Sequence, residues 1–273
     1  YVQLHIASDD LGSKIGFAGI RFLFAGILVT ILAIIQKRKF KVEQKSVVAW
    51  LLLFALVNTA LHYLFSYVGL GYLPSSRSTI LDSMNGFFAI ILSCIIFEDD
   101  KFSKFKALGC ILGFSGILLI NIEPGQNFFQ GISFRGDGMI LLNAMCGAFG
   151  GIITRIISKK MDMTVATSLS MTIGGAFLCV VSAIIGPAAR WTITTESIII
   201  MIGLILISAV CFGVYNQLLA YHPISKIAIF NAFIPILGVI FSSIILGEPM
   251  RVKYIIAGCM VALGVYVMNH FSK

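Results

Sequence analysis

Long apolar stretches separated by short polar segments are the dominant pattern along the chain. A helix needs about 20 predominantly apolar residues to cross the hydrocarbon core of a bilayer. Nine stretches meet this length, at approximately residues 13–36, 47–71, 75–97, 105–122, 137–158, 164–186, 196–220, 224–246 and 252–270. They are continuous and lack the alternation of a membrane β-barrel, so in lipid their backbone is satisfied only as helices. We therefore predict an all-α fold, a polytopic transmembrane helical bundle with nine spanning helices in this chain.

Composition strengthens the membrane assignment. Hydrophobic residues make up 58% of the 273 residues and charged residues 12%, whereas a soluble domain is about half apolar and about a quarter charged. The surplus apolar surface is expected to face the lipid bilayer. The net charge of +8 comes from short basic runs between apolar stretches, which is the pattern of orienting loops, so we expect no nucleic-acid partner. All six cysteines lie within apolar stretches, and no disulfide framework, metal site or cofactor is predicted.

The chain repeats itself when it is shifted by 149 positions. The Tyr-x-Pro at 72–74 then meets the Tyr-x-Pro at 221–223, and the Gly-Cys pair at 109–110 meets the pair at 258–259. Apolar helices resemble one another by chance, but turn and polar residues do so less readily, and the matches indicate two related halves. We expect a first repeat at residues 1–122, an extracytoplasmic linker at 123–135 and a second repeat at 136–273.

The same shift bears on the start of the chain. The counterpart of helix 137–158 would precede Tyr1, so residues 1–9 are expected to be the tail of a first helix that this chain largely lacks. The parent protein would then have ten helices, five in each half. An odd number of crossings inserts the two halves in opposite senses, and such inverted repeats are typical of transporters.

Basic residues in the loops predict the orientation. If the loop at 37–46 is cytoplasmic, the loops at 98–104, 159–163 and 221–226 share its side, together with the C-terminus. That side carries twelve Lys or Arg residues and the opposite side carries five. Cytoplasmic loops carry the excess of Lys and Arg. We therefore predict a multi-pass protein of the cell (inner) membrane with a cytoplasmic C-terminus.

Several stretches of the second half resemble a known family. Residues 231–235 (NAFIP) and 246–249 (LGEP), followed by Gly258 and Gly264, are similar to the end of an EamA-type domain. This domain defines much of the drug/metabolite transporter superfamily. The resemblance covers nearly the whole chain, and the order and spacing of its motifs are specific.

The first half carries part of the same pattern. It has residues 97–99 (FED), Gly109 and Gly116, and residues 21–25 (RFLFA) are similar to the family's second helix. This match assigns Arg21 a structural role. The resemblance implies two inverted five-helix repeats around a central cavity and secondary transport, usually efflux. Family members move amino acids, metabolites, drugs or nucleotide-linked sugars, so the substrate class stays open.

Helix 75–97 contains the candidate residue of greatest interest. Its i, i+4, i+7 spacing places Ser78, Asp82 and Asn85 on one face. A carboxylate inside a span costs about 2.5–3.5 kcal/mol, so Asp82 is expected to face protein or water rather than lipid. We interpret it as a site for a cationic or amine-bearing substrate or for a coupling proton. The alternative is a structural pair, but Arg77 is badly placed for one on the same helix and is expected to reach the membrane surface.

Two further predicted helices, the second and the seventh, carry polar stripes. The second places Asn58 and His62 on one face with Tyr67 beside them, and the seventh carries Tyr215 and Asn216. A solvated central cavity needs such residues, while interhelical hydrogen bonding is the alternative interpretation. The predicted substrate-binding residues are Asn58, His62, Tyr67, Asp82, Asn85, Tyr215, Asn216 and Asn231.

These patterns predict a secondary transporter that moves a small polar or amphipathic metabolite by alternating access, as an exporter by analogy with the family. We expect no enzyme and assign no catalytic residue, because there is no Walker A motif and the acidic run at 98–100 is typical of a solvated helix end. A membrane-embedded enzyme acting on a lipid-linked substrate and a passive channel are the alternatives. Small residues at 109 and 113 and at 258 and 262 favour packing between helices, with a homodimer as the alternative.

Overall fold

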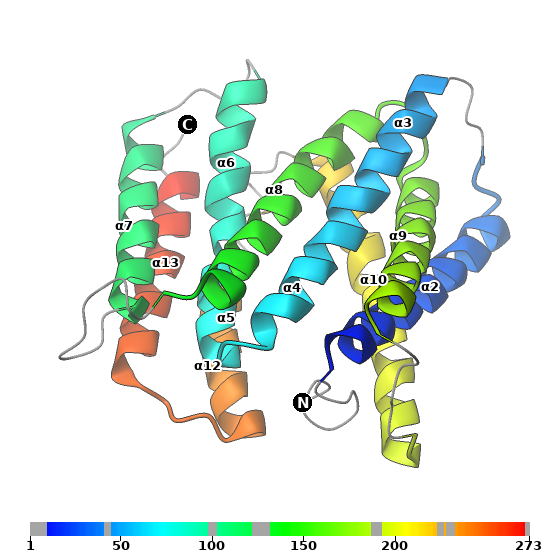
Figure 1. The fold of residues 1–273 in the computed structure, drawn as a ribbon. Coiled ribbons are helices and arrows are strands. Elements are labelled where there is room, and N and C mark those ends of the chain that lie inside the picture. The colour runs from blue at the N-terminus through cyan, green and yellow to red at the C-terminus, as the bar shows by residue number, and fades with distance from the viewer. Residues whose placement is uncertain are drawn as a thin grey trace. The chain divides into compact units, whose positions relative to one another are not determined.

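The computed structural model describes residues 10–40, 45–97, 103–121, 132–186, 193–222, 227 and 233–270. These residues are predominantly helical, and no strand occurs among them. In chain order the helices are α2 (Leu11–Ile35), α3 (Lys45–Phe54), η1 (Ala55–Leu61), α4 (His62–Leu70), α5 (Ser75–Asp82), α6 (Met84–Ile96), α7 (Lys104–Asn121), η3 (Phe134–Gly138), α8 (Met139–Ile157), α9 (Met163–Ile185), α10 (Thr195–Tyr221), α12 (Phe233–Leu246) and α13 (Val252–His270) (Figure 1). The predicted all-helical fold is confirmed.

The predicted spans match the observed helices closely. Asp10 explains why the first of them begins at Leu11, since its carboxylate accepts hydrogen bonds from the backbone N–H groups of Gly12 (2.8 Å) and Ser13 (3.1 Å). Within the described ranges, six helical segments are long and apolar enough to cross a membrane. The start of the predicted span 224–246 lies outside the described residues, and its described part is α12.

Three predicted spans are not regular α-helices. The span 47–71 contains the π-helix η1 between α3 and α4, and the span 137–158 begins within the π-helix η3. The span 75–97 is interrupted at Ser83, which separates α5 from α6. Hydropathy does not predict such irregularities, because they depend on where individual backbone groups find partners.

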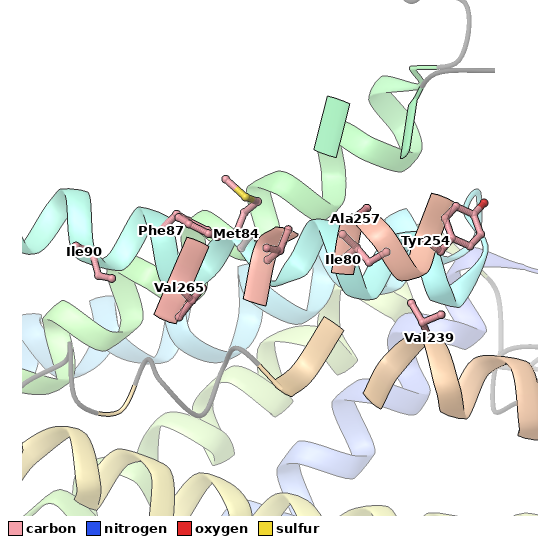
Figure 2. Close-up of a cluster of buried hydrophobic side chains, with 10 residues drawn as sticks. Ile80, Met84, Phe87, Ile90, Val239, Tyr254, Ala257 and Val265 are labelled. Atoms are coloured by element: carbon pink, nitrogen blue, oxygen red, sulfur yellow. The ribbon is translucent and has the colours of Figure 1, made fainter. Parts of the chain in front are cut away.

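The chain divides into two compact units that take segments from both sequence halves. Unit 1 comprises residues 1–67 and 150–221, and unit 2 comprises residues 68–149 and 222–273. In unit 2 the core side chains of α5 and α6, such as Ile80 and Phe87, pack against Val265 and other residues of α12 and α13 (Figure 2). Unit 1 has two apolar clusters, one around Phe22 and Tyr67 and the other around α3 and the start of α9.

In unit 1, α2 packs closely along α9. A Cβ atom on Gly19 would lie 3.0 Å from the carbonyl oxygen of Gly175, and a Cβ on Gly26 would lie 2.9 Å from that of Ser168. Residue numbers rise along α2 as they fall along α9, so the two helices are antiparallel. Glycine at these crossing points permits the backbones to approach each other.

In unit 2, α7 packs along α13 in the same manner. A Cβ on Gly264 would lie 2.6 Å from the carbonyl oxygen of Gly109, and a Cβ on Gly116 would lie 2.9 Å from that of Ala257. These helices are therefore antiparallel too, and small residues at their interface do serve packing within the chain. Both close pairs, α2 with α9 and α7 with α13, consist of helices that the 149-residue shift relates.

Candidate functional site

The predicted residue Asp82 lies next to a one-residue irregularity in its span. It is the last residue of α5, Ser83 follows as a cap, and α6 begins at Met84. The side-chain amide of Asn143, on α8, donates a hydrogen bond to the Asp82 carboxylate at 2.5 Å. Asp82 is half-buried, and its carboxylate contacts protein through this hydrogen bond, as the cost of a charge in lipid requires. Its neighbour Asn85 is also half-buried, on the first turn of α6.

The start of α5 is held by a residue from far along the chain. Pro74 occupies its N-cap position and offers no side-chain hydrogen bond. The Glu248 carboxylate instead accepts from the backbone N–H groups of Ser75 (2.7 Å) and Ser76 (3.0 Å) and from the Ser76 hydroxyl (2.7 Å). A carboxylate at a helix N-terminus satisfies donors that the helix leaves unpaired and favours the helix dipole. Glu248 thereby fixes the helix that ends in Asp82.

Arg77 is buried in an ion pair, whereas the sequence predicted a side chain that extends to the membrane surface. Its Nε and Nη2 atoms donate to one carboxylate oxygen of Asp137 in η3, at 2.8 and 2.5 Å. The two side chains are only 14% and 4% exposed, and Asp137 also accepts from the backbone N–H of Ser133 at 2.9 Å. The partner lies 60 positions along the chain, so helix spacing gave no signal of it. This ion pair joins α5 to the start of α8.

Asn58 lies in η1, the π-helical segment of unit 1. It is buried, and its side-chain nitrogen has no hydrogen-bond partner among the described residues. Its oxygen approaches Gly150, where a Cβ would lie only 2.5 Å away. The next residue, Thr59, forms a hydroxyl–hydroxyl hydrogen bond of 3.1 Å with Ser170 of α9. A buried amide with an unused donor in an irregular segment is a candidate for contact with a polar solute.

Arg21 is the centre of a polar and aromatic cluster in unit 1. Its Nε donates to the Ser208 hydroxyl at 2.7 Å, and its guanidinium carbon lies 4.9 Å from the ring centroid of Phe22 and 5.8 Å from that of Tyr63. It also hydrogen-bonds to the side chain of Tyr67, which is buried. The structural role predicted for Arg21 is supported by these contacts. Arg21 lies ten residues into an apolar helix, and from this position the sequence could have predicted that its charge needs polar or aromatic partners.

The remaining predicted residues are also placed by the structure. The ring of His62 meets that of Tyr63 edge-on at 4.9 Å between centroids, which connects His62 to the Arg21 cluster. Asn216 is buried and donates to the Thr167 hydroxyl at 3.1 Å, whereas its neighbour Tyr215 is 36% exposed. Asn58, His62, Tyr67, Tyr215 and Asn216 belong to unit 1, and Asp82 and Asn85 belong to unit 2. Asn231 lies outside the described residues.

Comparison with known proteins identifies relatives along the whole chain. The model of the EamA-like transporter family matches residues 1–122 and 134–270. The uncharacterized transporter YvbV of Bacillus subtilis (strain 168) is 27% identical, over 94% of this chain and 83% of its own length. YoaV of the same organism, also an uncharacterized transporter, is 22% identical over 100% of this chain and 92% of its own. A chloroplastic WAT1-related protein of Arabidopsis thaliana is 25% identical over 92% of this chain and 62% of its own.

A solved structure shares the fold. It matches with a TM-score of 0.69 over 95% of this chain and 88% of its own, at 10% sequence identity. The family match covers both halves of the sequence, and the apolar helices described above have the length that membrane crossing requires. The chain therefore belongs to the EamA-like transporter family, and it is a multi-pass membrane transporter.

Proposed function

We propose that the protein is a secondary transporter that carries a small polar or amphipathic metabolite across the cell membrane by alternating access. The observation that carries the proposal is the coincidence of polar residues with irregular helix geometry. Asn58 lies in a π-helix, and Asp82 precedes a one-residue irregularity at Ser83, each inside a segment long and apolar enough to cross a membrane. Irregular backbone at membrane depth is tolerated where it is buried in protein or lines a solvated cavity, and transporters bind solutes at such points.

The antiparallel helix pairs support an inverted repeat. A two-fold axis in the membrane plane brings a helix and its repeat counterpart together in opposite directions, as for α2 with α9 and α7 with α13. The contacts of the first pair are also reciprocal. Gly19 meets Gly175, and their counterparts under the shift, Ser168 and Gly26, meet each other. We assign residues 1–122 and 136–273 to the two repeats and residues 123–135 to the linker, and alternating access follows from exchange of their conformations.

The proposed substrate contacts are the polar residues named from the sequence. Asp82 is the residue for an amine group or a coupling proton, with Asn85 beside it on α6. In unit 1 the Asn58 amide has an unused donor, while His62, Tyr67, Tyr215 and Asn216 supply ring and hydroxyl or amide groups. We further propose that the protein exports its substrate, by analogy with the family. We place its C-terminus in the cytoplasm, because the loops on that side carry the excess of Lys and Arg.

Transport in sealed proteoliposomes tests the proposal. We expect saturable counterflow of a labelled metabolite without ATP, from a panel of amines, amino acids, nucleosides and sugars, and acceleration by an imposed proton gradient. Asp82→Asn removes the charge and keeps the shape, so it should abolish the effect of the gradient. Asp10→Asn is the matched control, because Asp10 caps α2 and asparagine caps a helix about as well as aspartate.

Two results would contradict the proposed transport, and a third would contradict the role of Asp82. Flux that does not saturate would indicate a channel, and turnover of a lipid-linked substrate in detergent would indicate an enzyme. An unchanged response of Asp82→Asn to the proton gradient would remove the coupling role from this residue.

A further inference from the structure

A cavity of about 920 Å³ lies at one end of unit 1, bordered by the end of α2, the start of α3, the turn between α8 and α9, and the end of α10. We call it the basic pocket. Its charged lining residues are Lys37, Arg38, Lys39, Lys159, Lys160 and Asp162. Among the described residues, five cations and one carboxylate therefore border the pocket. Since both lysine-rich turns border the same cavity, they lie at the same end of the unit.

Asp162, the carboxylate among the described lining residues, already has partners. Asp162 caps α9, where it accepts from the backbone N–H groups of Thr164 (2.8 Å) and Val165 (3.3 Å). It also forms an ion pair of 3.4 Å with Arg38. Lys160 lies over the ring of Trp50, 5.9 Å from its centroid. The positive charge of the described lining residues therefore exceeds what Asp162 balances.

Lys37 is held in a backbone conformation that disfavours it. Its φ of 55° is the only positive value among the described non-glycine residues. The hydrogen bonds Lys37 N–H to Ile34 O and Arg38 N–H to Ala33 O, both 2.9 Å, form the C-terminal motif that usually places glycine at this position. An unfavourable residue at such a position points to a function of its side chain, here a cation supplied to the pocket.

The pocket adjoins a surface suited to lipid chains. Ile31, Ile34 and Ile35, on the last two turns of α2, are exposed and lead to the pocket residue Gln36. Basic pockets between spanning helices at the membrane surface bind the phosphate of lipid head groups, and positive charge attracts anionic lipids there. The pocket thus combines excess cations, a volume for a head group, and an apolar approach from the bilayer.

We propose that the basic pocket binds a phosphate-bearing anion, supplied by the head group of an anionic membrane lipid or by a soluble phosphate compound. This proposal does not depend on transport. Lys37, Lys39 and Lys159 provide the charge for the phosphate, and Arg38, fixed by Asp162, borders the same cavity.

Thermal unfolding of the purified full chain in neutral detergent tests the proposal. The probes are phosphatidylglycerol, phosphatidylcholine, glycerol phosphate and inorganic phosphate, each titrated separately. A ligand of the folded state raises the melting temperature with concentration. We expect stabilisation by phosphatidylglycerol or by a soluble phosphate but not by phosphatidylcholine. Stabilisation by the lipid alone identifies a head-group site, and equal stabilisation by glycerol phosphate identifies a soluble anion.

The variant Lys37→Gly/Lys159→Gln separates binding from folding. Glycine relieves the backbone conformation at position 37, so the fold should tolerate the change. Loss of two lysines should raise the half-saturating concentration about tenfold or more. The control Lys45→Gln/Lys104→Gln removes two cations that do not border the pocket, and its half-saturating concentration should be unchanged. Equal effects of both variants, or equal stabilisation by phosphatidylcholine, would overturn the proposal.

Discussion

At the scale of single residues, side chains from distant parts of the sequence position the helix that carries Asp82. Glu248 supplies the N-terminal cap that Pro74 cannot, and it does so from a turn that starts at Gly247. Gly247 has φ of 65°, a conformation that glycine adopts at little cost. The LGEP stretch, which from the sequence alone marked only a family resemblance, therefore has a defined structural task in unit 2.

Removing this cap should destabilise unit 2. We expect Glu248→Ala to lower the free energy of unfolding by about 1–2 kcal/mol, because two backbone N–H groups at the start of α5 lose their acceptor. Gly247→Ala should cost about 1 kcal/mol through the backbone alone. Thermal unfolding in detergent measures both. Ser133→Ala, which removes the serine cap of η3, is the comparison for loss of a helix cap elsewhere in unit 2. A melting temperature unchanged by Glu248→Ala would contradict the role assigned to Glu248.

At the scale of elements, small residues set how closely the helices pack. A Cβ on Gly26 of α2 would lie 2.4 Å from the Thr172 hydroxyl and 2.5 Å from the Thr172 backbone nitrogen on α9. A backbone atom cannot rotate away, so the helices would have to separate. By contrast, a Cβ on Gly203 of α10 would meet nothing within 4 Å.

Substitution by alanine should therefore have opposite effects at these two positions. Gly26→Ala should destabilise the protein by about 1–3 kcal/mol through overpacking. Gly203→Ala should be neutral or stabilise by up to about 1 kcal/mol, since alanine favours the helix. The midpoint of thermal unfolding reports the difference between these matched variants. If Gly26→Ala were as stable as Gly203→Ala, the close contact of α2 with α9 would be wrong.

The helices themselves were predictable, whereas their irregularities were not. Apolar length determines a membrane span, and for α2 the polar residue Asp10 marks its start. The π-helix around Asn58 and the irregularity at Ser83 are local changes of backbone hydrogen bonding, which hydropathy does not encode. The partner of Arg77 could not be predicted either, because Asp137 is remote in the sequence. The two residues lie in different apolar segments, and their ion pair replaces the exposure that was expected for Arg77.

At the scale of the whole molecule, an inverted repeat makes a prediction about the sides of the membrane. The 149-residue shift relates the loop at 37–46 to the loop at 186–195. In unit 1 the ion pair between Arg38 and Asp162 holds the first of these loops near the turn that precedes α9. α9 spans Met163–Ile185, so the loop at its far end should lie on the other side.

Labelling of single cysteines in cells tests this arrangement. All six native cysteines would first be replaced by serine, and cysteine then placed at Lys39, Ser158 or Ile193, the last of which is 77% exposed. We expect a membrane-impermeant thiol reagent added outside to modify the cysteine at 193 and to spare those at 39 and 158 until the membrane is opened. Positions 39 and 193 lie in loops that the 149-residue shift relates. In inverted halves such counterpart loops lie on opposite sides of the membrane. Modification of 39 and 193 from the same side would instead make the repeats parallel, and rocking of two inverted halves would then no longer describe the transport cycle.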